Sequence, residues 1–188
     1  MSAAKELFEL QMRQQGHDDR VHRDILCLPV QARIKHMVFH FAKYTGHLIK
    51  AKQERDEKLL MSTLVDTWVI VLASSNMLNI KLSKALNIEE KDFPNLSEVG
   101  QGLAASLYPS SSDVYDLGLC ELGKITGRMA KACESLDHLE KWDYRSCLEQ
   151  CIIEIAKLSL AMSSLIRRDL GPLVYERWEA VERKSIFS

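Results

Sequence analysis

The chain has 188 residues, 46% of them hydrophobic, which is enough to bury one substantial core and too little for two large independent domains. Its 25 Lys and Arg residues nearly balance its 26 Asp and Glu residues, so the net charge of −1 excludes a general attraction to nucleic acid or to an acidic membrane surface. The five cysteines form no CxxC pair, and residues 1–15 lack the apolar segment of a signal peptide. We therefore expect a reduced, cytoplasmic protein.

The predicted secondary structure is entirely helical. Glycine and proline are scarce, with 8 and 4 residues, and apolar residues recur at spacings of three and four, as on one face of a helix. The polar stretch 16–24 shows no clear pattern, and residues 79–97 are expected to form a loop that carries a short helix. Ser112 or Asp113 is expected to cap the helix that follows it. In chain order, the expected helices cover 3–15, 30–54, 57–80, 95–107, 113–136, 141–169 and 172–183.

Two parts of the chain resemble each other. The segments 41–52, FAKYTGHLIKAK, and 122–133, LGKITGRMAKAC, share the same residue at five positions. The helices after them also correspond, because LVDTWVIVLASSNML (64–78) and CLEQCIIEIAKLSLA (147–161) are both apolar nearly all round, as buried central helices are. We infer an ancient duplication; the alternative is a generic likeness between helical hairpins.

These patterns predict an all-α fold. The whole chain is expected to form one domain, a helical bundle built from two similar antiparallel helical hairpins with short accessory helices. The hairpins cover 30–80 and 114–168, and the C-terminal helix covers 172–183. Gly46 and Gly127 lie at equivalent sites inside the two first arms, where glycine costs about 1 kcal/mol relative to alanine. We expect a close helix crossing at these glycines to justify that cost.

The first hairpin resembles the all-α nucleotide pyrophosphohydrolases of the MazG type. The stretch RIKHMVFHFAKYTGHLIKA (33–51) is similar to the first helix of phage and actinobacterial members, and LVDTWVIVLASSNMLNIKLSKAL (64–86) is similar to the second helix and its exit. The ending YERWEAVERKS (175–185) is similar to that of some relatives. The resemblance covers roughly 34–88 and 175–185, and it implies a MazG-like bundle that hydrolyses nucleoside triphosphates with Mg²⁺.

The chain departs from this family at its metal ligands. In the register of the resemblance, Tyr44 and His47 stand where two metal-binding glutamates belong, and Thr63 stands at the first acid of the second helix. Asp66 falls on the family's aspartate, and Glu149 is its counterpart in the second hairpin, so these two are the candidate metal ligands if Mg²⁺ is bound. Because Mg²⁺ requires several oxygen ligands, we predict weak or absent hydrolysis by the family's reaction.

Basic residues replace acids along both first arms. They recur every three or four residues, and three of the positions are cationic at the same spacing in both halves. We predict an anion-binding surface for a phosphorylated small molecule or an acidic protein, because Lys and Arg bind phosphate directly; the alternative is a solvated polar face. The candidate residues are Lys43, His47, Lys50, Lys124, Arg128 and Lys131.

Other metal-ligand spacings are weaker. His36 and His40 lie one helical turn apart, but no third ligand accompanies them. Cys147 and Cys151 share that spacing, and we expect them to be buried thiols in a helical core.

Two functions therefore remain open. The first is a MazG-like nucleotide- or phosphate-binding protein with a degenerate active site. The second is a non-enzymatic helical interaction module, an adaptor or inhibitor of a protein partner, with Trp142 and Phe187 as candidate anchors and a homodimer as one option. No cofactor is predicted other than Mg²⁺ in the event of catalysis.

Overall fold

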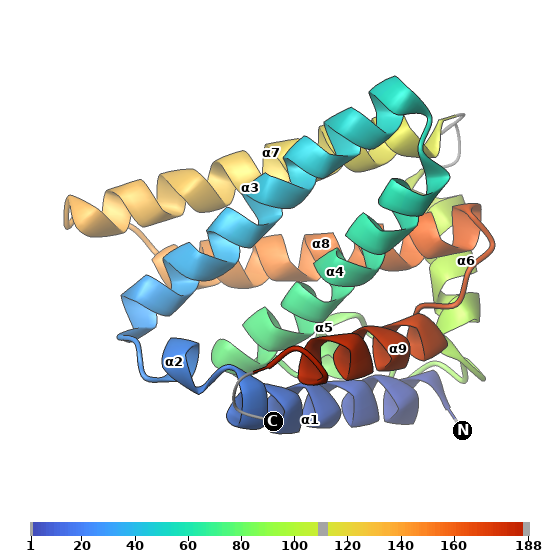
Figure 1. The fold of residues 1–188 in the computed structure, drawn as a ribbon, viewed down its shortest axis with the longest axis horizontal. Coiled ribbons are helices and arrows are strands. Elements are labelled where there is room, and N and C mark those ends of the chain that lie inside the picture. Colours follow the sequence, from blue (N-terminus) through green and yellow to red (C-terminus); the bar gives the residue numbers. More distant parts are fainter. Residues whose placement is uncertain (1, 109–112, 186–188) are drawn as a thin grey trace.

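The structure is a computed structural model that describes residues 2–108 and 113–185. Within these ranges the regular secondary structure is helical and no strand occurs, so the predicted all-α fold is confirmed (Figure 1). The helices are α1 (Ala3–Val21), α2 (Arg23–Leu26), α3 (Val30–Glu54), α4 (Glu57–Met77), α5 (Leu82–Ala85), α6 (Leu96–Leu107), α7 (Val114–Asp137), α8 (Tyr144–Leu165) and α9 (Leu170–Glu182).

Four long helices form the bundle as two antiparallel hairpins, α3–α4 and α7–α8. The first arms pack against each other, α3 on α7, and the second arms pack against each other, α4 on α8 (Figure 1). Because α3 and α7 are antiparallel, ion pairs link their opposite ends, Lys35 with Asp137 at 2.6 Å and Arg55 with Asp113 at 2.9 Å. The duplication of the hairpin stays a prediction.

Helix α4 lies at the centre of the molecule. It contacts α1, α3, α8 and α9, and its side chains Trp68, Val71 and Leu72 are fully buried. By length and composition alone α4 is apolar enough to cross a membrane, yet 61% of that stretch is buried inside the protein. Its apolar character is therefore accounted for by the contacts that surround it.

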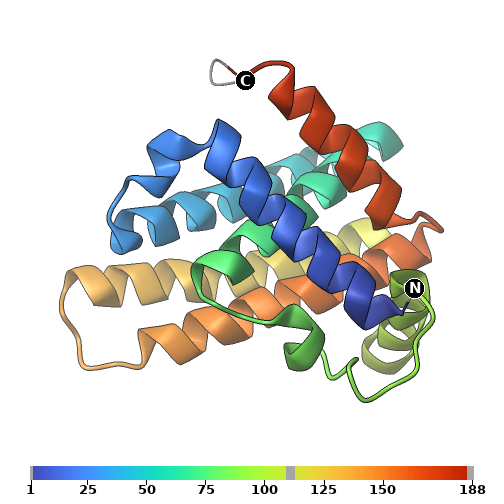
Figure 2. The ribbon, with the colours of Figure 1, turned by 90° about the horizontal axis from the view of Figure 1, so that it is seen from below.

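Accessory helices cover the second arms. Helices α1 and α9 lie against α4, and α1 crosses the lower side of the bundle (Figure 2). Helix α6 packs against α8 so closely that a Cβ added at Gly100 would lie 2.5 Å from the carbonyl oxygen of Leu160. The glycine that a close approach requires is therefore Gly100.

The expected crossing at Gly46 and Gly127 is wrong. Neither glycine has any atom within 4 Å of an added Cβ, and both lie on exposed parts of their helices. Other glycines of α7 face α3 instead: an added Cβ would lie 3.4 Å from a Leu48 methyl group at Gly118 and 3.7 Å from the Thr45 methyl group at Gly123. The similarity between the two segments therefore predicted the contact between α3 and α7 at the wrong glycines.

Several helix ends differ from the expected ones. Helix α1 continues to Val21 instead of residue 15, because the polar stretch after Gly16 stays helical. Helix α8 begins one residue after its cap Asp143, whose side chain accepts a hydrogen bond from the Ser146 N–H. Helix α9 begins at Leu170, before the Gly-Pro pair, since proline is tolerated in the first turn of a helix.

Candidate functional site

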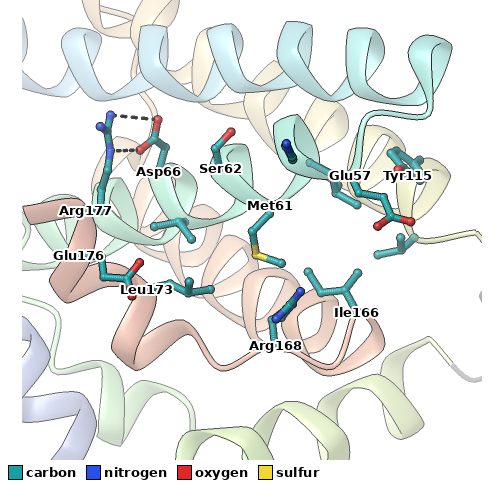
Figure 3. Close-up of a pocket in the computed structure, with 14 residues that line it drawn as sticks. Glu57, Met61, Ser62, Asp66, Tyr115, Ile166, Arg168, Leu173, Glu176 and Arg177 are labelled. Carbon is teal, nitrogen blue, oxygen red and sulfur yellow. Dashed lines mark hydrogen bonds and ion pairs between the residues drawn. The ribbon is translucent and has the colours of Figure 1, made fainter. Parts of the chain in front are cut away.

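A groove of about 1010 Å³ lies between α4 and α9, where the start of α7 and the end of α8 complete its walls (Figure 3). Its floor and walls are apolar. Three basic and three acidic side chains line it as well, so the groove carries charges of both signs. The apolar residues are Leu60, Met61, Val65, Val114, Tyr115, Ile166 and Leu173, and the charged ones are Glu57, Lys58, Asp66, Arg168, Glu176 and Arg177.

At one end of the groove, Asp66 of α4 is bound by Arg177 of α9 (Figure 3). Arg177 donates from Nε to Oδ1 at 2.5 Å and from Nη2 to Oδ2 at 3.3 Å, so the guanidinium engages both carboxylate oxygens. The Asp66 side chain is only 20% exposed. Arg177 belongs to the C-terminal stretch of the resemblance, and its neighbour Trp178 anchors α9 by donating from Nε1 to Gln14 Oε1 at 2.7 Å.

The side chains at the positions where the resemblance places acids cannot together serve as ligands of Mg²⁺. Burial and the nearby charge of Asp66 raise the pKa of the Tyr44 hydroxyl, which therefore stays protonated. The ring of His47 lies against that of Tyr44, with centroids 6.1 Å apart. Thr63 is buried, and the one carboxylate at these positions, that of Asp66, already accepts hydrogen bonds from Arg177. An octahedral oxygen site cannot form from this set.

Glu149, the counterpart of Asp66, lies on the other hairpin. Its carboxylate pairs with Arg145 of the same helix, 2.6 Å away. Neither acid belongs to a group of three or more ligand-type side chains within the described ranges. A metal centre at Asp66 and Glu149 stays a prediction without support from this geometry.

Two basic groove residues have no partner. The side chains of Lys58 and Arg168 are exposed and take part in no hydrogen bond or ion pair among residues 2–108 and 113–185. Figure 3 shows Arg168 reaching from the end of α8 toward Met61. Sequence reasoning missed both residues, because one lies at the start of a helix and the other just after a helix end.

The predicted cationic surface divides into two sets. On α7, Lys124 pairs with Glu121 at 2.8 Å, and Arg128 pairs with Glu154. Lys131 lies near two glutamates, the closer at 3.1 Å. Each cation of α7 therefore has its own counterion, which weakens its attraction for a further anion.

On α3, the predicted residues Lys43 and Lys50 have no acidic partner among the described residues. Lys43 lies 4.7 Å from the ring centre of Tyr44 and 3.3 Å from His40 Nδ1, and Lys50 is exposed without a partner in the described structure. Among the described residues, no hydrogen bond or ion pair joins Lys43, His47 or Lys50 of α3 to the three cations of α7. The anion-binding surface that sequence predicted stays a prediction.

A second cavity, of about 380 Å³, lies between α1, α2, α3 and α4. His36 and His40 line it with their Nε2 atoms 3.1 Å apart, and burial and nearby positive charge lower the pKa of His40 to about 4. Asp18 lines it too, and burial raises the pKa of its carboxyl to about 7. The cavity thus gathers half-buried polar groups from α1 and α3.

The remaining sequence candidates are placed as follows. Cys151 is buried and Cys147 is half-buried, and both thiols are free. Trp142 is 42% exposed, in the connection between α7 and α8. Phe187 lies outside the described residues.

No protein-family model matches this chain, and no curated protein and no solved structure shows significant similarity to it.

Proposed function

We propose that this protein binds a phosphorylated, nucleotide-like ligand in the groove between α4 and α9 and does not hydrolyse it by the Mg²⁺-dependent reaction of the MazG-type enzymes. The observation that carries the proposal is the presence of Lys58 and Arg168 in the groove, both without a counterion in the part of the chain that the structure describes. Arginine and lysine bind phosphate oxygens directly, without a metal.

The other walls of the groove suit the rest of such a ligand. Tyr115 and the aliphatic side chains offer an apolar surface for a base, and Glu57 and Glu176 can accept hydrogen bonds from amino or hydroxyl groups. The groove carries charges of both signs. A ligand with one anionic end and several hydrogen-bond donors therefore matches its lining better than a simple polyanion does. The likeness of residues 34–88 to MazG-type proteins supports the same ligand class.

The ion pair of Asp66 with Arg177 supports binding without hydrolysis. A metal bound at Asp66 would first have to displace the guanidinium from both oxygens. Tyr44, protonated and buried beside this pair, adds no anionic ligand. The positions that the resemblance assigns to metal ligands therefore offer too few free anionic oxygens for a Mg²⁺ centre.

The test is a titration of nucleoside mono-, di- and triphosphates, with inorganic phosphate for comparison, by calorimetry at low and high salt. Binding should weaken as salt rises, since screening acts over about 10 Å at 0.1 M ionic strength. The double variant Lys58→Gln, Arg168→Gln should lose about 10-fold or more in affinity. Lys141→Gln, an exposed and unpaired lysine outside the groove, is the matched control and should bind like the original protein.

A pyrophosphate-release assay with Mg²⁺ or Mn²⁺ completes the test. We expect no turnover with any common nucleotide. Turnover of about 1 s⁻¹, within the ordinary enzyme range and abolished by Asp66→Asn, would refute binding without hydrolysis. If no phosphorylated compound binds, the alternative of an interaction module is favoured instead.

A further inference from the structure

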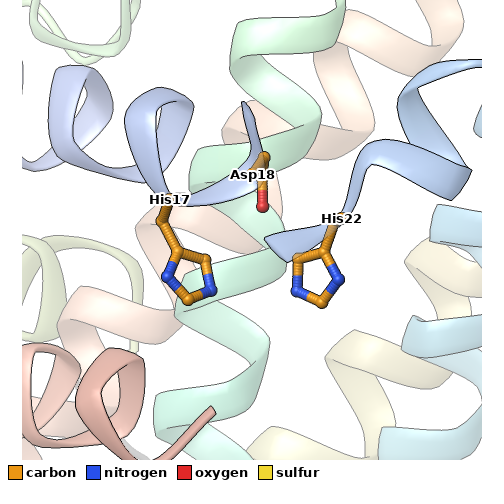
Figure 4. Close-up of side chains that lie close together, drawn as sticks. All are labelled: His17, Asp18 and His22. Carbon is orange, nitrogen blue, oxygen red and sulfur yellow. The ribbon is translucent and has the colours of Figure 1, made fainter. Parts of the chain in front are cut away.

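Three ligand-type side chains gather at the C-terminal end of α1. His17, Asp18 and His22 each offer one nitrogen or oxygen, and these atoms lie within 4.8 Å of one another. Figure 4 shows the Asp18 side chain between the two imidazole rings, whose centroids are 5.5 Å apart. No other group of three or more His, Cys, Asp or Glu side chains in the described parts of the chain comes this close.

The end of the helix creates this cluster. In an uninterrupted helix, residues 17 and 22 would point about 140° apart. Helix α1 ends at Val21, and the backbone of His22 takes φ −125° and ψ 36°, outside the helical region. This turn brings the His22 ring back toward His17 and Asp18.

His17 is already oriented for a metal. Its side chain is 2% exposed, and its Nδ1 lies 3.0 Å from Oε1 of Glu182 on α9. Arg20 binds the same Glu182 oxygen at 2.8 Å and holds the carboxylate in place. With the Nδ1 proton donated to Glu182, the lone pair of His17 is on Nε2. Metal-binding histidines are commonly held by a carboxylate in this way.

The donor set defines the class of ion. Two imidazoles and one carboxylate suit a first-row transition ion such as Zn²⁺, whereas Mg²⁺ and Ca²⁺ prefer oxygen ligands alone. Asp18 and His22 also line the cavity of about 380 Å³, so a fourth ligand, water or a small molecule, has access to the ion. The partial negative charge at the C-terminal end of α1 favours a cation there.

We propose that His17 Nε2, the Asp18 carboxylate and the His22 imidazole bind one Zn²⁺ ion, with Glu182 as the residue that orients His17. Three protein ligands leave one coordination position open toward the cavity. The proposal does not depend on the groove between α4 and α9, which shares no residue with this cluster.

The experiment is a titration of the whole, tag-free protein, treated with a chelator and dialysed, with Co²⁺ as a spectroscopic substitute for Zn²⁺. We expect one Co²⁺ per chain, visible ligand-field bands of a four- or five-coordinate ion, and loss of the bands when Zn²⁺ is added. His22→Ala and Asp18→Asn should each weaken binding by about 10-fold or more. Glu182→Gln should weaken it by about 10-fold through the orientation of His17.

Controls separate this site from other histidines and thiols. His138→Ala, which removes an exposed histidine outside the cluster, should bind Co²⁺ like the original protein. Circular dichroism confirms that each variant is folded. The proposal is overturned if the folded protein binds no stoichiometric Co²⁺, if the double variant His22→Ala, Asp18→Asn binds as tightly, or if a thiolate-to-cobalt charge-transfer band shows that Cys147 or Cys151 holds the ion.

Discussion

The hairpin α3–α4 and the hairpin α7–α8 differ in what covers their second arms. Helices α1 and α9 lie against α4, and both cavities described above lie along that hairpin. Helix α6 covers α8 and approaches it to within direct backbone contact at Gly100. The two cavities thus lie along the first hairpin, with the start of α7 and the end of α8 contributing to one of them, whereas α6 packs directly on α8.

The matched acids show the same difference. Asp66 of α4 pairs with Arg177 of α9, which lies 111 positions away in the sequence. Glu149 of α8 pairs with Arg145 one turn earlier in its own helix. The two matched acids therefore have partners of different origin, one on an accessory helix and the other on the same helix.

The largest effect on stability is expected where α6 packs on α8, from Gly100→Ala. The new Cβ would lie 2.5 Å from the Leu160 carbonyl oxygen, which cannot move without shifting α8. We expect a loss of about 2 kcal/mol in the free energy of unfolding, measured by urea denaturation. Gly102→Ala, in the same helix with nothing within 4 Å of the new Cβ, should be neutral or slightly stabilising. Equal effects of the two changes would contradict the close contact.

The ion pairs of the two second arms should differ in strength. A double-mutant cycle on Asp66→Asn and Arg177→Met should give a coupling energy of about 1 kcal/mol, because Asp66 is largely shielded from water. The cycle on Glu149→Gln and Arg145→Met should give about 0.3 to 0.5 kcal/mol, as for an ordinary pair one turn apart. Both cycles use denaturant unfolding. A coupling at Glu149 as strong as that at Asp66 would remove the contrast.

The matched glycines of the two similar segments should respond alike to substitution. Gly46→Ala and Gly127→Ala should each stabilise the protein by about 0.5 to 1 kcal/mol, since both positions are helical and have free space around the new methyl group. Thermal unfolding followed by circular dichroism measures the gain. A loss of stability at either position would show a contact that the structure does not contain.

The smallest perturbation is chemical labelling of the thiols, which changes no residue. Burial raises the pKa of Cys151 to about 12, so its thiol stays protonated at pH 8 and should react slowly with iodoacetamide. The exposed Cys27 and Cys120 should be labelled first. Mass spectrometry after short exposures gives the order. Early labelling of Cys151 would show that the α7–α8 hairpin opens.

The sequence by itself determined the helices and their pairing into hairpins. The spacing of apolar residues placed α3 at the predicted residues, and Asp113 caps α7 as one of two expected residues. The sequence also predicted a buried central helix over 64–78, and Trp68 within it is fully buried. These features depend on local periodicity and capping, which act over a few residues.

The tertiary structure alone decided where sites form. The pairing of Asp66 with Arg177 joins residues from distant helices, and the groove with Lys58 and Arg168 exists only because α9 returns to α4. The cluster of His17 and His22 depends on a helix end that periodicity does not reveal, since their spacing of five matches no helix face. Packing of accessory helices, which the sequence pattern of the hairpins does not encode, determines which charges meet.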